Sequence, residues 1–233
     1  MPASARVLDR AATRGADVVL DALVGLVVTA ALLAGLVRPG FPLLRDWVAT
    51  PNPPLSDAAL GLGESAARAV PQDVALAWAS RALAWAGLPV WPLTGLLTAL
   101  FCVWLAVAAG ALVRQVMPRP GGPVARAEAG AGAAVGFWVR LPAVVVAVWN
   151  PFVVERLLQG HWSLLAGVAA VMTMPVLLAP GAGEVRTRRG PEWARKWSRS
   201  GRSGCATDGA VRIATACAAL AAAGLTPTGW VLA

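Results

Sequence analysis

Long apolar blocks separated by short polar stretches dominate the chain. A bilayer core about 30 Å thick requires roughly 20 apolar residues of helix, and five blocks meet or approach that length. They run from about Ala16 to Val37, Val90 to Val113, Ala129 to Trp149, Trp162 to Leu178, and Ile213 to Ala233. This pattern predicts an all-α polytopic transmembrane helix bundle of about five spans.

A proline-rich stretch and a short helical segment separate the first two blocks. Five prolines between residues 39 and 54 predict an extended and stiff chain. The segment 73–87, "DVALAWASRALAWAG", has a helical composition but is too short to span, and Trp78 and Trp85 lie on one face. We interpret it as an interfacial helix on the outer surface. The alternative is the start of a long, bent second span.

Arginine clusters predict the orientation of the chain. Basic residues concentrate in the N-terminal arm 1–15, in loop 114–128 and in loop 181–212, and the positive-inside rule places such segments in the cytoplasm. Loops 38–89 and 150–161 then face outward. The expected localisation is therefore the cell membrane, as a multi-pass protein with a cytoplasmic N-terminus.

Four domain-level units follow from this orientation. Residues 1–15 form a cytoplasmic N-terminal arm, residues 16–180 the membrane domain with outer loop 38–89, residues 181–212 a basic cytoplasmic loop, and residues 213–233 a last span, either complete or truncated. Asp17 and Asp21 interrupt the start of the first apolar block, which favours an uncleaved signal anchor over a cleaved signal peptide.

Composition agrees with the membrane class. Hydrophobic residues make up 58% of the 233 residues and charged residues 14%, and the mean hydropathy is +0.64. The net charge of +8 sits in clusters that flank apolar blocks, which argues against nucleic-acid binding. The three cysteines, Cys102, Cys205 and Cys217, lie in predicted spans or in a cytoplasmic loop, so we expect no disulfide framework.

Two local features stand out in the third block. Arg140 lies inside it, next to Pro142, so either this arginine faces the protein interior or the region consists of two broken half-helices. Asn150–Pro151 should end the span, because proline disfavours helix in the residue before it. The next helix then starts near Phe152, with Glu155 and Gln159 on one face.

Candidate chemistry is confined to the outer side. The chain has no phosphate loop, no H-E-x-x-H, no C-x-x-C and no G-x-S-x-G, and a single histidine excludes a histidine-rich metal site. Arg45 and Asp46 follow the first span, and Glu155, Arg156 and His161 precede the fourth. A carboxylate partly buried beside rings such as Trp47 and Trp162 is suited to act as a general base. The alternative for each residue is a boundary charge solvated at the headgroups.

The phrases "LLRDWVATPNPPLSDAALGLGESAARAVPQD" and "NPFVVERLLQGHWSLLAG" carry a resemblance that covers about residues 16 to 180. In their order around one span, a long outer loop and an interfacial helix, they resemble the front half of the multi-spanning GT-C glycosyltransferases, and most of all the related actinobacterial membrane proteins. That family uses polyprenyl-phosphate-linked sugars and a catalytic aspartate in the first outer loop. The matching position here is Asp46. Members usually show eight or more spans and often a paired acidic motif, whereas this chain offers five spans, and Asp46 stands alone beside Arg45.

The resemblance implies a glycosyltransferase, or a truncated relative, that transfers a sugar from a polyprenyl-phosphate donor to an acceptor on the outer face. Asp46 would be the catalytic base, and Arg45, Glu155, Arg156 and His161 would bind the acceptor or the donor phosphate. No metal ligand set is predicted, and the cofactor is unknown. Two alternatives remain: a non-catalytic membrane partner protein of an envelope-assembly complex, and a transporter or flippase subunit.

Overall fold

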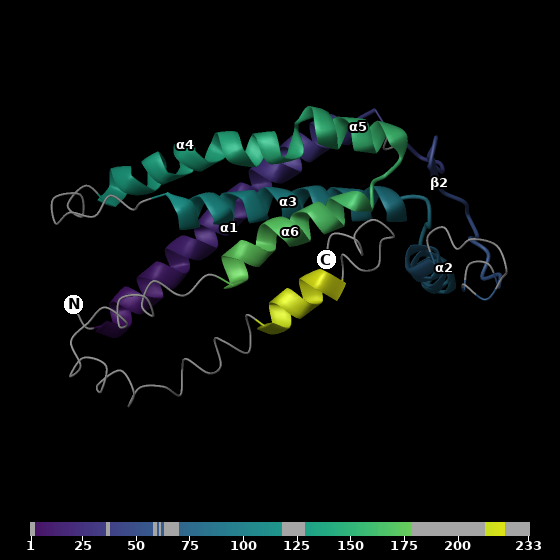
Figure 1. Cartoon of the computed structure of the whole chain (residues 1–233), viewed down its shortest axis with the longest axis horizontal. Helices are drawn as coiled ribbons and strands as arrows, with labels where there is room; N and C mark the ends of the chain where they lie inside the picture. The colour runs from purple at the N-terminus through teal and green to yellow at the C-terminus, as the bar shows by residue number, and fades with distance from the viewer. Residues whose placement is uncertain are drawn as a thin grey trace.

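The protein is described here by a computed structural model that covers residues 3–35, 38–57, 60, 62, 70–117, 129–178 and 213–221. Helices dominate these residues (Figure 1). In chain order the elements are α1 (Ala3–Leu33), β1 (Leu43–Leu44), β2 (Trp47–Val48), α2 (Val70–Trp85), α3 (Leu93–Val116), α4 (Ala129–Val148), α5 (Pro151–Gln159) and α6 (Leu164–Leu178). A further helical stretch covers residues 213–221.

Within the described residues, three helical stretches are long and apolar enough to cross a membrane. They are Gly15–Leu33, Leu93–Val116 and Gly136–Gln159, whereas the apolar helix α6, Leu164–Leu178, is shorter. A bundle of about five spans is therefore not confirmed. The basic loop 181–212 lies outside the described residues, as does most of the expected fifth span beyond residue 221. Helix α1 begins at Ala3, so most of the expected N-terminal arm continues the first span as helix.

Helix α3 occupies the centre of the bundle and packs against α1, α4 and α6 (Figure 1). Its buried face is made mostly of small residues, which let neighbouring backbones approach closely. The large fully buried side chains are supplied by several helices and include Leu105 of α3, Val144 and Val148 of α4, and Leu165 of α6. Small residues on one helix and branched residues on its neighbours thus fill the core.

The seam between α1 and α3 shows this packing most clearly. Asp21 and Gly25 lie four residues apart on α1, and Ala106 and Gly110 lie four apart on α3. A Cβ added at Gly25 would lie 2.5 Å from the Ala106 Cβ, and one added at Gly110 would overlap the Asp21 carboxylate. Because both glycines lie where a side chain has no room, the two backbones meet in one register, with Asp21 opposite Gly110.

Helix α4 runs unbroken through Pro142, from Ala129 to Val148. Arg140 is buried inside the bundle, with 4% of its surface exposed. Of the two sequence-based alternatives for this arginine, the structure therefore shows the first: it faces the protein interior, and the helix is not divided into two half-helices.

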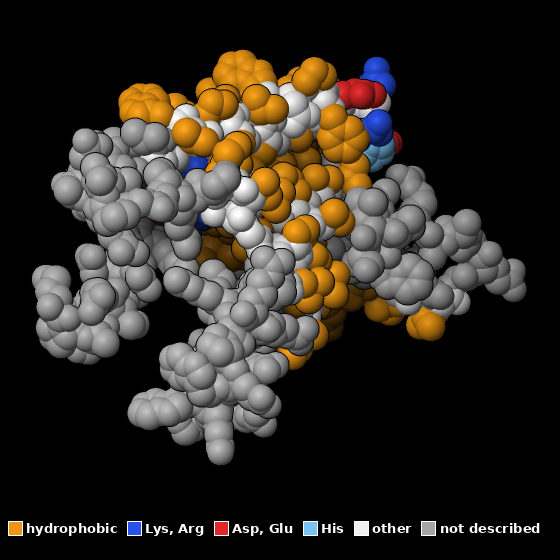
Figure 2. Space-filling view, turned by 60° about the vertical axis from the view of Figure 1, so that its left-hand side comes forward, with side chains coloured by type: hydrophobic (Ala, Val, Ile, Leu, Met, Phe, Trp, Pro, Cys, Tyr) orange, Lys and Arg blue, Asp and Glu red, His pale blue; other side chains and the backbone are white. Residues whose placement is uncertain are grey.

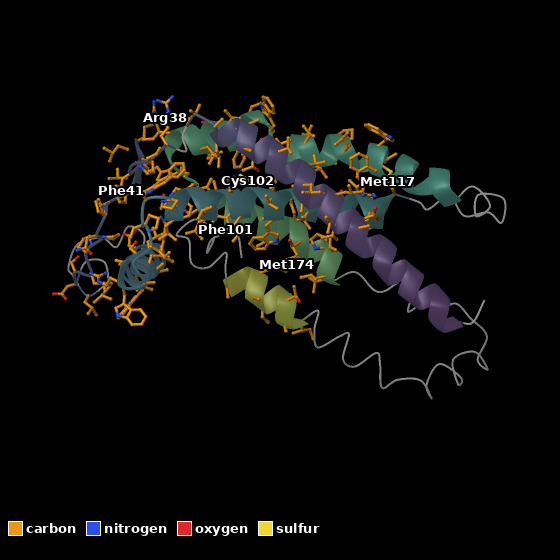
Figure 3. The ribbon with its side chains drawn as sticks, turned by 180° about the vertical axis from the view of Figure 1, so that it is seen from behind. Arg38, Phe41, Phe101, Cys102, Met117 and Met174 are labelled. Carbon is orange, nitrogen blue, oxygen red and sulfur yellow. The ribbon has the colours of Figure 1, made fainter. Side chains whose placement is uncertain are left out.

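The two ends of the bundle differ in what covers them. The β-hairpin, α5 and α2 lie at one end (Figure 1). Figure 3, seen from behind, shows Arg38 and Phe41 at that end and Met117 near the opposite end of α3, with Phe101 and Cys102 between them. We call the end with the hairpin the hairpin end. The distribution of arginines along the sequence predicts that the hairpin end faces outward.

Candidate functional site at the hairpin end

Asp46 is presented by a tight hairpin. Leu43 pairs with Val48 and Leu44 with Trp47 in antiparallel register, which leaves Arg45 and Asp46 as a two-residue turn. Arg45 has a φ of 46°, and two-residue hairpins favour a positive φ at the first turn position because it matches the twist of the strands. The turn thus displays both side chains outward, and both residues are exposed.

The second half of the site is built by α5 and the turn after it. The Asn150 side chain accepts a hydrogen bond from the Val153 N–H at 3.0 Å, and Pro151 occupies the first turn of the helix, where its missing N–H costs nothing. The predicted helix break at Asn150–Pro151 is therefore confirmed, but the stretch of membrane-spanning length does not end there, because it runs from Gly136 to Gln159. Gly160 ends the helix with a φ of 89°, and His161 N–H donates to Arg156 O at 2.8 Å.

Gly160 is also where the hairpin docks. A Cβ at this residue would lie 2.8 Å from the Leu44 carbonyl oxygen and would collide with the Trp47 amide nitrogen. The Asp46 N–H donates to the Gln159 carbonyl at 3.2 Å. Glycine is required here twice, by its left-handed conformation and by the close approach of the hairpin backbone.

This docking brings Asp46 to the only histidine of the chain. Asp46 Oδ2 lies 3.1 Å from His161 Nε2, and the side chains are 61% and 39% exposed, respectively. The partial burial expected for Asp46 beside Trp47 and Trp162 is therefore not found. Those rings belong to the hydrophobic core instead: Trp47 is 2% exposed and Trp162 4%.

An aromatic layer supports the pair from below. The ring centroids of Trp47 and Trp162 are 6.4 Å apart, and Phe101 of α3 stacks on Trp162 at 6.1 Å, with the ring planes 7° apart. The buried indole N–H of Trp47 has no hydrogen-bond partner within the part of the chain that the structure describes. The aromatic layer therefore connects the hairpin to the hydrophobic core.

Arg156 and Glu155 are linked through Gln159. Arg156 Nη1 donates to Gln159 Oε1 at 2.8 Å, and Gln159 Nε2 donates to Glu155 Oε1 at 2.9 Å. Arg156 Nη2 lies 3.8 Å from the same Glu155 oxygen, which is too long for a good hydrogen bond. The Arg156 guanidinium lies over the Phe152 ring, 5.4 Å from its centroid. The Arg156 Nε is buried without a partner among the described residues.

The structure therefore brings together four of the five predicted site residues, Asp46, Glu155, Arg156 and His161, at one end of the bundle, and Arg45 occupies the neighbouring turn position. Figure 2 shows basic, acidic and histidine side chains meeting at the edge of an apolar surface. Sequence reasoning missed the bridging role of Gln159 and the docking role of Gly160. Within the described residues, no group of three or more His, Cys, Asp or Glu side chains could hold a metal ion.

A second charged cluster lies inside the bundle, toward the opposite end. Asp21 Oδ1 accepts from Arg140 Nε at 3.2 Å, and Asp17 Oδ1 accepts from Arg140 Nη2 at 3.0 Å. Arg114 of α3 pairs with the other Asp21 oxygen. The two acids and two bases come from three helices, and Asp21 is 1% exposed. Every one of the four charges has an opposite partner, so the cluster carries no net charge.

The described residues are mostly helical, with three apolar stretches of membrane-spanning length among them and a polar site at one end of the bundle. Its apolar helices support a membrane-embedded protein in contact with lipid. Comparison with protein-family models, with curated proteins and with solved structures gave no match.

Proposed function

We propose that the protein is a GT-C-like glycosyltransferase that acts at the outer face of the membrane on a polyprenyl-phosphate-linked sugar. The observation that carries the proposal is the Asp46–His161 pair, 3.1 Å apart and open to solvent. A carboxylate beside an imidazole is a common base unit, because the acid orients the ring and stabilises its protonated form. In the reaction, this pair accepts the proton of an acceptor hydroxyl. The oxygen then bonds to the sugar C1, and the C1–O bond to phosphate breaks with its electron pair on the departing lipid phosphate.

The pair is not needed to hold the fold. Exposed ion pairs contribute about 0–1 kcal/mol, and the hairpin is already held by the Gly160 contact, by the backbone bond from Asp46 to Gln159 and by the burial of Trp47. An exposed Asp–His pair that stability does not require, displayed on a rigid turn, supports a role in binding or chemistry.

Arg156 supports the phosphate part of the proposal. Its present partners are the neutral Gln159 oxygen and the distant Glu155 carboxylate, and its buried Nε has no partner among the described residues. Phosphate oxygens would offer the guanidinium a two-pronged contact that lysine cannot reproduce.

The proposal is tested by binding and turnover of a polyprenyl-phosphate sugar with purified protein in nanodiscs. We expect Asp46→Asn to abolish turnover while leaving donor binding nearly intact. Arg156→Lys should weaken donor binding about tenfold or more, since a hydrogen bond to a charged group contributes about 1.5–3 kcal/mol. The matched controls are Asp57→Asn and Arg38→Lys, both at exposed positions of the same loop. Equal binding by wild type and Arg156→Ala, or no binding by either, would remove the proposal.

Membrane orientation is part of the proposal, because the site must face outward. The arginine distribution supports a cytoplasmic N-terminus. On a background lacking the three cysteines, a membrane-impermeant thiol reagent should label Asn52→Cys in intact cells and spare Gly121→Cys. Labelling of position 121 instead would place the Asp46–His161 pair in the cytoplasm and exclude an extracytoplasmic reaction.

A non-catalytic partner protein of an envelope-assembly complex is the second candidate. It is favoured by the hydrogen bonds through which Gln159 links Arg156 to Glu155, because side chains that already have protein partners need no substrate. This candidate predicts that Asp46→Asn and Arg156→Lys change neither donor binding nor turnover, and that a membrane protein co-purifies with wild type in mild detergent. A transporter would need polar groups available inside the bundle, whereas Asp17, Asp21, Arg114 and Arg140 are paired with one another.

A further inference from the structure

Helix α2 is the one long helix of the described chain that lies across the bundle. Figure 1 shows it end-on beside the hairpin end, whereas α1, α3 and α4 are seen from the side. Its C-terminus turns sharply at Gly87, which has a φ of 71°, and Leu88 N–H donates back to Leu83 O at 2.8 Å. Helix α3 begins at Leu93. With only seven residues between the two helices, the end of α2 is held at the height of the hairpin end of α3.

The faces of α2 are unlike one another. Ala77 and Ser80 are buried, whereas Trp78 is 62% exposed and Trp85 92%. Seven residues of helix turn the chain through about 700°, so the two indoles lie within about 20° of each other. Arg81 lies at the edge of this face, about 40° from Trp85 and 60° from Trp78, and its guanidinium donates to the Pro53 and Ala77 carbonyls at 3.3 and 3.1 Å. One face of α2 thus carries two large exposed rings, with Arg81 and the Pro53 carbonyl at its border.

We propose that this face of α2 is a docking surface for the headgroup layer of the leaflet at the hairpin end, with Trp78 and Trp85 inserted at the boundary with the acyl chains. Indoles favour this boundary because the ring is apolar and the N–H is polar. The exterior of α3 near its hairpin end is also apolar, since Leu96 and Leu100 are 65% and 59% exposed. Lipid that covers these leucines reaches the height at which α2 lies.

Length and composition exclude a spanning role for α2. The helix has 16 residues, about 24 Å at 1.5 Å per residue, which is less than the hydrocarbon thickness. It is not among the apolar helices, long or short, of the described chain, and it is separate from α3. The alternative of a long, bent second span is therefore not what the structure shows, and a helix in the plane of the membrane surface fits both its direction and its rings.

Lipid docking of α2 would also hold the outer loop. Arg81 fastens the loop at Pro53, and Gln159 fastens the same loop at Asp46. The chain between these points is thus attached to the bundle at one side and to the lipid-bound helix at the other. The height of α2 in the headgroup layer then sets the height of the hairpin above the membrane. This inference does not depend on the proposed activity.

The test is depth-dependent quenching in vesicles of phosphatidylcholine and phosphatidylglycerol that contain no other protein. A small environment-sensitive fluorophore is attached to Trp78→Cys, Trp85→Cys or Ala84→Cys, on a background lacking the native cysteines. Ala84 is exposed and points about 120° away from Trp78, so it is the matched control. We expect labels at 78 and 85 to be quenched most by shallow lipid-borne quenchers and the label at 84 to be quenched by aqueous iodide.

Three outcomes would overturn the proposal. Labels at 78 and 85 that iodide quenches as strongly as the label at 84 would leave the face in water, as a surface for another protein. Maximal quenching of either label by quenchers at the bilayer centre would make α2 part of a span. Equal lipid quenching at 78, 84 and 85 would mean that the helix is surrounded by lipid rather than docked by one face.

Discussion

The substitution Asp21→Asn should lower the free energy of unfolding far more than Asp17→Asn. The Asp21 carboxylate is 1% exposed, accepts from Arg140 Nε at 3.2 Å and pairs with Arg114. Asp21→Asn keeps the shape of the side chain but removes the charge that faces both arginines. The Arg140 side chain, which is 5% exposed, would keep only the Asp17 carboxylate as a partner, and the Asp17 side chain is 28% exposed. The change therefore leaves buried positive charge without adequate compensation.

The expected loss follows from the burial of these groups. Breaking a buried ion pair costs about 3–5 kcal/mol, whereas an ordinary hydrogen bond between membrane helices contributes about 0.6 kcal/mol. Because Arg140 keeps one partner and Arg114 is 18% exposed, we expect the lower end, about 3 kcal/mol. A free-energy change of 1.4 kcal/mol is tenfold in an equilibrium constant, so the unfolded fraction should rise by roughly two orders of magnitude. Asp17→Asn removes one partly exposed contact and should cost about 1 kcal/mol or less.

The assay is reversible unfolding in bicelles, with the free energy of unfolding measured by steric trapping at two sites on α1 and α3. The double variant Asp21→Asn/Arg140→Met completes the cycle, and it should recover part of the loss because no unpaired charge is left on α4. If Asp21→Asn costs no more than Asp17→Asn, or if the double variant is additive, the three-helix charge network does not hold the bundle and the reasoning fails.

Other substitutions test the close approaches. Gly110→Ala should cost about 1–3 kcal/mol, because its Cβ would overlap the Asp21 carboxylate; the same unfolding assay measures it, and a neutral result would show that α1 and α3 are further apart. Gly160→Ala combines a φ of 89° with a collision against the hairpin backbone, so it should exceed Gly87→Ala, which has a φ of 71° and open space, by at least about 1 kcal/mol. Equal losses for both glycines would mean that the hairpin does not dock on Gly160. Trp162→Ala removes the stack on Phe101 and should cost about 3–5 kcal/mol, and a loss below about 1 kcal/mol would contradict the aromatic layer.

Local rules made part of this fold predictable. The break at Asn150–Pro151 depends on two adjacent residues, and the sharing of a face by Glu155 and Gln159 depends on helical periodicity alone, so both could be inferred before any tertiary contact was known. The beginnings and ends of α3, α4 and α6 fall within three residues of the predicted ones. Helix α1 extends further toward the N-terminus than predicted because the apolar pattern marks the span and says nothing of a polar helical extension.

Pairings between distant segments could not be predicted in the same way. Asp46 and His161 are 115 positions apart and meet only because Gly160 adopts a left-handed conformation that admits the hairpin. In the sequence, Arg140 was recognisable as a charged residue inside an apolar block. Its partner Asp21 was visible only as a charged residue near the start of a different apolar block, with nothing to link the two. Matching them requires the rotation of α1 and α4 about their axes, which is set by side-chain packing on α3.

The two charged clusters differ in how much they should contribute to the stability of the fold. Around Asp21, four charges from three helices are paired where water is scarce, so removing one leaves a cost that the rest of the bundle must bear. Around Asp46, the pair with His161 is open to solvent and the hairpin is held by backbone contacts and buried rings. Substitution of Asp46 or His161 should therefore change the free energy of unfolding by only about 0.5 kcal/mol or less. Stability measurements can therefore separate the clusters before any substrate is known: a large loss for Asp46→Asn would make the hairpin pair part of the scaffold, whereas a small one leaves its exposed charges to be explained by binding.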